Sequence, residues 1–153
     1  MPEFKYSFQE YDPLIHVRAS GREVDISPKA AREICATIKG MSLTQAKNFL
    51  ENVIKLKQPV PFKRYKKEIG HRGGIQGFYT GRYPVKAAKK ILEVLNNLEA
   101  NADYKGMDID RLVIIHAAAM RGRKIKTYIP RAFGRSSPHF NTLVHLEFVA
   151  KEV

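Results

Sequence analysis

The chain has 153 residues, of which 27 are Lys or Arg and 15 are Asp or Glu, so its formal net charge is +12. This length suits one domain over residues 1–153, and a hydrophobic content of 44% excludes a wholly disordered chain. A cationic surplus of this size repels itself unless a polyanion neutralises it, which favours nucleic acid or an anionic membrane as partner. The longest apolar run, residues 112–120, is far shorter than the roughly 20 residues of a membrane span, so no membrane partner is predicted.

The first half of the chain predicts one strand and two helices. Residues 14–20 alternate enough to form a strand. A helix over 28–39 follows, because Ser27 can cap its start and Gly40 suits the left-handed position after its end. A second helix is predicted over 42–57, where apolar residues recur on one face.

The second half predicts a third helix and a hairpin. Residues 84–102 carry an apolar stripe at helical spacing, and residues 111–120 and 141–153 are typical of strands. Because one connection joins these strands directly, we expect an antiparallel hairpin whose far end, residues 121–138, projects beyond the sheet. The predicted fold class is therefore α+β, with three helices packed on a small antiparallel sheet and a long projecting β-hairpin.

Positive charge is concentrated in two segments. Residues 55–90 hold eleven Lys or Arg against one acid, Glu68, and residues 111–146 hold seven with no acid. The remaining residues hold nine basic and fourteen acidic side chains, so they are slightly acidic. This asymmetry predicts a near-neutral scaffold that carries two segments facing a polyanion.

The basic segment 111–146 contains the projecting arm, residues 121–138. An isolated two-stranded ribbon is marginally stable in water, so we expect a bound polyanion to order it. A flexible, solvated basic loop is the alternative, but the arm also carries aromatic rings that can stack on bases. The predicted RNA-binding residues of the arm are Arg121, Arg123, Lys124, Lys126, Tyr128, Arg131, Phe133 and Arg135.

The basic segment 55–90 contains the insertion, residues 59–83, in which five aromatic residues alternate with cations and glycines. A loop of this length inside a compact domain is either functional or disordered. Basic residues interleaved with aromatic ones suit irregular RNA, whose unpaired bases are accessible. A mobile insertion without a role is the alternative. The predicted RNA-binding residues here are Lys63, Arg64, Lys66, Lys67, Arg72 and Arg82.

Catalysis and metal binding are not predicted. The histidines lack metal-ligand spacing, and His16, His116 and His145 fall in strands, where structural roles are commoner. We find no nucleophile with its base and no cofactor motif. The single cysteine, Cys35, and an N-terminus without a signal-peptide pattern predict an intracellular protein of a reducing compartment.

Two stretches resemble a known family. The first is "SPKAAREICATIKGMSLTQA", which carries an S-P-[KR]-x-[AV]-R opening followed by I-[KR]-G-x-[ST]-x-x-x-A. The second is the arm, where the matching positions are Gly122, Ile125, Lys126, Pro130, Arg131, Ala132, Gly134 and Arg135. In their order and spacing these stretches resemble large-subunit ribosomal protein family number twenty-two, which is number seventeen in the eukaryotic scheme. The N-terminal dozen residues and the insertion resemble its archaeal-type branch.

The resemblance implies a function for the two basic segments. Such a protein is a structural constituent of the large ribosomal subunit that binds 23S-type rRNA, aids subunit assembly, and lines the nascent-peptide exit tunnel with its hairpin arm. Its partners would be large-subunit rRNA, neighbouring ribosomal proteins and the nascent polypeptide, in the cytoplasm. The alternatives are a free-standing basic protein that binds chromatin or duplex nucleic acid, and an RNA-processing enzyme.

Overall fold

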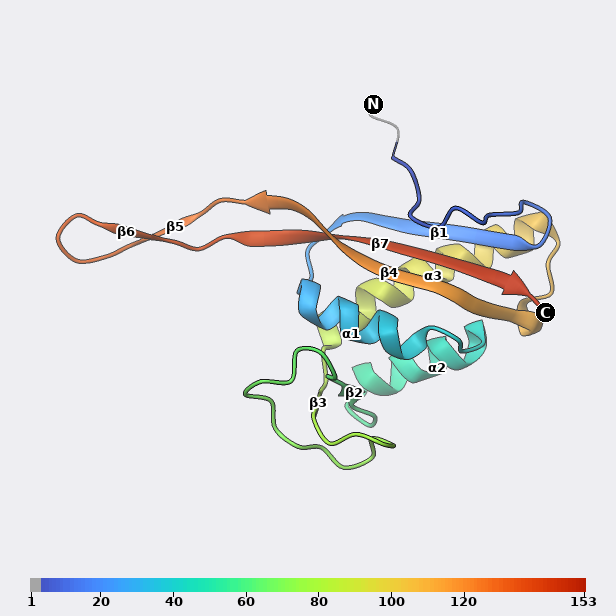
Figure 1. The fold of residues 1–153 in the computed structure, drawn as a ribbon, viewed down its shortest axis with the longest axis horizontal. Helices are drawn as coiled ribbons and strands as arrows, with labels where there is room; N and C mark the ends of the chain where they lie inside the picture. The colour runs from blue at the N-terminus through green and yellow to red at the C-terminus, as the bar shows by residue number, and fades with distance from the viewer. Residues whose placement is uncertain (1–3) are drawn as a thin grey trace.

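The computed structural model describes residues 4–153, so the first three residues of the N-terminal stretch lie outside the described residues. Figure 1 shows helices gathered beneath a sheet from which a long hairpin projects to one side. The elements in chain order are β1 (His16–Val24), α1 (Pro28–Ile38), α2 (Leu43–Ile54), β2 (Val60–Pro61), β3 (Gly81–Arg82), α3 (Val85–Lys105), the 3₁₀ turn η1 (Ile109–Arg111), β4 (Leu112–Ile125), β5 (Tyr128–Pro130), β6 (Ser136–Pro138) and β7 (Asn141–Glu152).

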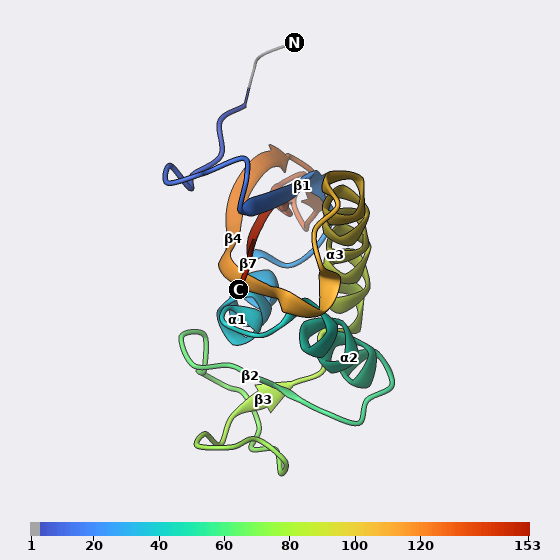
Figure 2. The same cartoon turned by 90° about the vertical axis from the view of Figure 1, so that its right-hand side faces the viewer.

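The main sheet has three antiparallel strands in the order β1-β7-β4. Phe148 in the central strand pairs with Ala19 of β1 and with Ala117 of β4. Seen along the sheet, the three helices lie on one side of it and the N-terminal segment lies on the other (Figure 2). The predicted α+β fold class, with three helices on an antiparallel sheet and a projecting hairpin, is confirmed.

The core lies between the helices and the inner face of the sheet. Each helix buries an apolar stripe, with Ile34, Leu50 and Leu95 fully buried. Val85 and Leu92 fall on the stripe predicted for the third helix but are only half-buried. Leu146 and Phe148 of the central strand meet the helices from the sheet and are also fully buried. The core draws on the scaffold alone, because every residue from Arg123 to Phe140 except the half-buried Ser137 is exposed.

Two helix ends differ from the sequence prediction. The second helix stops at Ile54 rather than at residue 57, because Leu56 adopts a left-handed conformation with φ of 58°. The third helix runs past residue 102 to Lys105, where Gly106, with φ of 71°, terminates it. A glycine commonly occupies the left-handed position after a helix, as Gly106 does after α3. Leu56 is not a glycine, so the sequence marks the end of α2 less clearly than the end of α3.

Beyond Arg121 and its partner Val144, where the pairing of β1 ends, the hairpin leaves the three-stranded sheet as a two-stranded ribbon. Strands β4 and β7 continue their ladder as far as Ile125 and Asn141, with a register shift between Arg121 and Lys124. Residues 126–140 lie beyond this ladder, and within them β5 and β6 pair over three residues on each side. The predicted arm, residues 121–138, therefore starts as a continuation of the β4–β7 ladder, and residues 126–140 form its free end.

We predict that in the isolated protein the amides of residues 126–140 exchange with solvent much faster than those of α1, α2 and α3. The arm contributes no side chain to the core, and its cations repel one another. Hydrogen exchange read by mass spectrometry measures this directly. Equal protection in the arm and in the helices would contradict the prediction.

The N-terminal segment, residues 4–11, covers the outer face of the sheet. The backbone N–H and hydroxyl of Ser7 donate to one carboxylate oxygen of Glu147, at 2.9 and 2.7 Å, and Arg22 donates to the other oxygen at 2.9 Å. The guanidinium of Arg22 lies 3.5 Å from the centre of the Phe4 ring. Burial raises the pKa of Glu147, but the hydrogen bonds from Ser7 and Arg22 outweigh it and leave this pKa below its usual value of 4.5.

We predict that acid detaches this segment before the core unfolds. The folded-state pKa of Glu147 lies below its unfolded value, so the stabilisation is complete above about pH 4.5 and is lost as the pH falls through the lowered pKa. NMR signals of residues 4–11 should change in that window, and a Glu147→Gln variant should lose this pH dependence. Signals that stay constant in the wild-type protein while the core is folded would contradict it.

Candidate nucleic-acid interface

The arm ends in a tight turn that holds its aromatic tip outward. The backbone N–H of Arg131 donates to the carbonyl of Arg135 at 2.7 Å and closes the turn. Phe133, at its apex, has a φ of 57° and is 93% exposed. Lower on the arm, the Tyr128 ring meets the Phe140 ring edge to face, with centroids 5.7 Å apart. A 93% exposed phenylalanine on a strained turn has no packing role within this chain.

The cations of the arm are exposed and unpaired. Among residues 4–153, none of the six arm cations forms an ion pair, whereas seven salt bridges stabilise the scaffold. Arg131 makes a side-chain hydrogen bond to the hydroxyl of Ser137, at 3.3 Å, which steers its guanidinium along the ribbon. Cations without acidic partners are available to phosphate groups. The predicted arm residues are therefore placed together on one projecting element.

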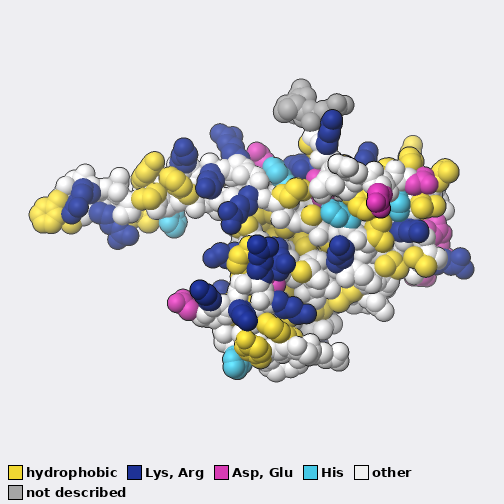
Figure 3. Space-filling model, in the orientation of Figure 1, with side chains coloured by type: hydrophobic (Ala, Val, Ile, Leu, Met, Phe, Trp, Pro, Cys, Tyr) yellow, Lys and Arg dark blue, Asp and Glu magenta, His cyan; other side chains and the backbone are white. Residues whose placement is uncertain are grey.

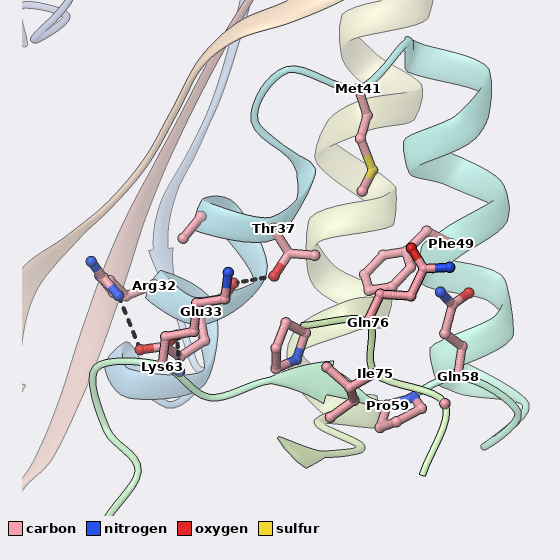
Figure 4. A pocket seen from close by; sticks show the side chains of 13 residues that line it. Arg32, Glu33, Thr37, Met41, Phe49, Gln58, Pro59, Lys63, Ile75 and Gln76 are labelled. Carbon is pink, nitrogen blue, oxygen red and sulfur yellow. Dashed lines mark hydrogen bonds and ion pairs between the residues drawn. The ribbon is translucent and has the colours of Figure 1, made fainter. Parts of the chain in front are cut away.

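A buried carboxylate anchors the insertion to α1. Glu33 is 1% exposed, and its two oxygens accept hydrogen bonds from the backbone N–H groups of three consecutive residues, at 3.0–3.3 Å (Lys63, Arg64 and Tyr65). Arg32 also donates to Glu33, at 3.0 Å. Figure 4 shows Glu33 between Arg32 and the turn at Lys63, beside the cavity that α1 and α2 form with the insertion. Because the amides turn inward to Glu33, the Lys63 and Arg64 side chains face solvent, while Tyr65 is half-buried against the core.

A short ladder joins the two ends of the insertion to each other. Strands β2 and β3 pair Val60 with Arg82, and the hydroxyl of buried Thr80 donates to the carbonyl of Phe62 at 2.8 Å. Between these ties the chain is largely exposed. The insertion is therefore a loop that is anchored at its base. The sequence alone allows either a functional loop or a mobile one here.

The predicted cations of the insertion are exposed, and three of the six lie over aromatic rings. The Phe78 and Tyr79 rings stack with centroids 4.8 Å apart, and the Lys63 ammonium lies 6.0 Å from the Phe78 ring centre. The Arg72 guanidinium lies 5.6 Å from the centre of the Tyr83 ring. Each pair places a cation that can bind a phosphate next to an aromatic ring on which a base can stack.

The predicted site residues form two groups at the same end of the molecule. The arm leaves the sheet at the end where α1 begins and where the insertion hangs below the helices (Figure 1). Lys and Arg side chains gather along the arm and again over this end of α1 and the insertion (Figure 3). The two groups are separated by the base of the arm, so a single partner that touches both must extend over this whole end.

Sequence reasoning missed two contributors to this surface. Glu33 belongs to no motif, but its position three residues after buried Ala30 and one before Ile34 places an acid on the apolar face of a helix. Lys29 is exposed in the first turn of α1, and in the sequence it matches only the basic position of the S-P-[KR] motif. A buried acid on an apolar face signals that donors must reach it from elsewhere. Which donors those are depends on a segment thirty residues away.

Three further features of the described residues bear on function: the placement of the metal-ligand residue types, the apolarity of the helices and the single cysteine. Among the described residues, no three His, Cys, Asp or Glu side chains gather as a metal site. No helix within residues 4–153 is both long enough and apolar enough to cross a membrane. Cys35 is buried in α1, and burial raises the pKa of its thiol to about 12, so it stays protonated and unreactive while the core is folded.

The fold and its two basic segments define a small basic α+β protein built around a projecting hairpin. The sequence pattern described as ribosomal protein L22p/L17e matches residues 19–151. The chain belongs to this family.

Curated relatives agree over the full length. The large ribosomal subunit protein uL22 of Cenarchaeum symbiosum is 53% identical over 152 residues, covering 99% of each chain. Its counterpart from Archaeoglobus fulgidus is 48% identical over 151 residues, covering 99% of this chain and 97% of the relative. The protein of the same name from Nitrosopumilus maritimus is 48% identical over 153 residues and covers both chains completely.

These matches confirm the resemblance found in the sequence, including its archaeal-type branch. They also support a structural, non-enzymatic role in the ribosome, in agreement with the expectation that the chain is not an enzyme. The individual contact residues in the arm and insertion remain predictions, and the structure gives their positions.

Proposed function

We propose that this chain is a structural constituent of the large ribosomal subunit, in the cytoplasm, that binds large-subunit rRNA through its arm and its insertion. The observation that carries the proposal is the arm: six exposed cations without an acidic partner among residues 4–153, on a ribbon that buries nothing in its own core. rRNA phosphates neutralise these cations and order the ribbon. The remaining surface is near neutral, so assembly on RNA is directed to one end of the molecule.

The arm suits a second role within the same assembly. Its free part is narrow, because only the β5–β6 pair and the 131–135 turn extend past the β4–β7 ladder. A thin basic ribbon can pass between RNA elements where the helical scaffold cannot. We propose that its tip lines the nascent-peptide exit tunnel, where exposed Phe133 contacts the nascent polypeptide, while the scaffold stays outside near other ribosomal proteins and aids subunit assembly.

We expect binding to large-subunit rRNA to weaken steeply with salt, and single arm substitutions to reduce that dependence. For irregular RNA the slope of log K against log salt is about −0.7 for each phosphate neutralised. Arg131→Ala and Arg135→Ala should therefore each make the slope shallower by about 0.7, as measured by filter binding or anisotropy over a salt series.

The matched control is Arg111→Ala. Arg111 is an exposed arginine in η1, at the opposite end of β4 from the arm, where Asp108 pairs with it at 3.6 Å. Its removal should leave the salt slope unchanged. If both arm variants also keep the wild-type slope, these arginines do not bind phosphate and the proposed role of the arm is wrong.

A further inference from the structure

A second cavity, distinct from the one in Figure 4, lies between the insertion and the starts of α1 and α3. Its volume is about 620 Å³, within the range of small-molecule and cofactor sites. Its walls come from three places: the first turn of α1 at Ser27–Ala30, the insertion at 62–69, and residues 82–84 just before α3. The cavity is therefore built from segments that the fold holds in place at both ends of the insertion.

Cations dominate the lining of this cavity. Five line it and one acid, Glu68, does so as well (Lys29, Arg64, Lys66, Lys67 and Arg82). All five cations are exposed, and none forms an ion pair with a described residue, Glu68 included. The cavity also opens beside the starts of α1 and α3, whose dipoles add positive potential. An occupant of this cavity must carry negative charge.

Two half-buried tyrosines supply flat surfaces among these charges. Tyr65 and Tyr83 line the cavity from opposite ends of the insertion. The Lys29 ammonium and the Arg64 guanidinium each lie 5.8 Å from the centre of the Tyr65 ring. A planar group that contacts this ring therefore places an attached anion within reach of both cations. Glu33 holds the backbone of residues 63–65, and the Tyr65 ring packs against the core, so both are in place before any ligand arrives.

We propose that this cavity binds a single unpaired nucleotide of an RNA strand, with its base against Tyr65 or Tyr83 and its phosphate among the cations. The inference rests on the proposed RNA-binding function and names a specific contact within it. A paired base lies inside a helix and cannot enter a cavity of this kind, whereas an unpaired base can be turned out of its strand and stacked on an aromatic ring. The cavity thus selects a bulged or single-stranded nucleotide, while the arm binds backbone phosphates.

Photo-crosslinking tests the assignment on the full chain. The probe is a five-nucleotide uridine oligoribonucleotide with 4-thiouridine at its centre, and crosslinked peptides are mapped by mass spectrometry. We expect crosslinks within residues 62–69 and 82–84. We also expect the affinity for the uridine pentamer to fall about tenfold when its central base is replaced by an abasic site, because one stacking contact is lost. Crosslinks confined to the arm, or equal affinities for the two oligonucleotides, would overturn the proposal.

Substitution of the rings gives an independent test. Tyr65→Leu and Tyr83→Leu both keep apolar bulk at the cavity wall, and the one that removes the stacking ring should bring the affinities for the intact and abasic oligonucleotides to within twofold of each other. The matched control is Tyr104→Leu, since Tyr104 is a 94% exposed tyrosine on α3 that does not line the cavity. Protection of the Cys35 thiol from labelling reports that each variant is folded. Should Tyr65→Leu unfold, Tyr83→Leu and the crosslinked peptides decide the result.

The cavity proposal and the broader function fail in different ways. If Arg131→Ala reduces the salt slope on large-subunit rRNA but Tyr65→Leu and Tyr83→Leu still distinguish the two oligonucleotides as the wild type does, only the cavity proposal is wrong. If the wild-type chain shows no salt-dependent binding to that rRNA, the proposed function is wrong and the cavity proposal falls with it.

Discussion

Replacing Glu33 with Ala is expected to lower the free energy of unfolding by about 3 kcal/mol and to release the base of the insertion from α1. Three consecutive backbone N–H groups lose their acceptor, and leaving buried donors unsatisfied costs about 1–3 kcal/mol each. The turn at Lys63 lies close to the surface, so water can recover part of this loss and the total stays near the lower end. Chemical denaturation and hydrogen exchange over residues 60–82 measure the two effects.

Two variants make this test specific. Glu33→Gln keeps one acceptor oxygen and should cost less than the alanine substitution. Glu51→Gln removes an exposed carboxylate that pairs with Lys55 at 3.2 Å, and should change stability by no more than about 0.5 kcal/mol. If Glu33→Ala unfolds within 1 kcal/mol of the wild type and its insertion stays protected, the carboxylate does not anchor the insertion.

Removing the end of the arm is expected to leave the scaffold folded but to weaken the binding of the chain to large-subunit rRNA. Ile125 and Asn141 are cross-strand partners, so residues 126–140 can be replaced by an Asn-Gly turn that closes the existing ladder. Three cations leave with this segment (Lys126, Arg131 and Arg135). At about 0.7 per phosphate, the salt slope on large-subunit rRNA should become shallower by about 2, and affinity near physiological salt should fall at least tenfold.

The shortened chain also tests the placement of the tip. Slow labelling of Cys35 should persist, since the thiol lies in the core of the scaffold. Large subunits that contain the shortened chain should show altered nascent-chain passage or altered sensitivity to tunnel-binding antibiotics, with peptide-bond formation intact. Rapid Cys35 labelling would mean that the arm belongs to the core. Normal tunnel behaviour in assembled subunits would mean that the tip lies elsewhere.

The elements that the sequence predicts best are those with strong local signals. Ser27 and Gly40 mark the ends of α1, and the Ser27 hydroxyl does accept a hydrogen bond from the Ala30 N–H, at 3.5 Å. The hairpin followed from a direct connection between two strand-like runs. By contrast, the pairing of exposed residues up to Ile125 and Asn141 depends on the register of the whole ladder, which no local pattern specifies.

The candidate interface divides in the same way. Its composition was visible in the sequence, because cations without acids mark both segments. Its construction was not, because Glu33 binds the turn at Lys63, thirty residues away, and because Lys29 and Arg82 line one cavity although they lie more than fifty residues apart in the sequence. The covering of the sheet by residues 4–11 was likewise unpredicted, since it depends on Glu147 near the other end of the chain.

The central claim is that the arm and the insertion contact large-subunit rRNA within an assembled subunit. Site-specific crosslinking tests it most directly, with a photoreactive phenylalanine analogue placed at Phe133 in one variant and at Tyr79 in another, and with large subunits purified through a high-salt wash. Both side chains are exposed and neither contributes to the core, so the replacements should not disturb folding. We predict that both variants sediment with large subunits, that the Tyr79 position crosslinks to rRNA, and that the Phe133 position crosslinks to tunnel rRNA or to the nascent polypeptide. Loss of the chain in the salt wash, or crosslinks from both positions to proteins or DNA outside the ribosome, would contradict the account.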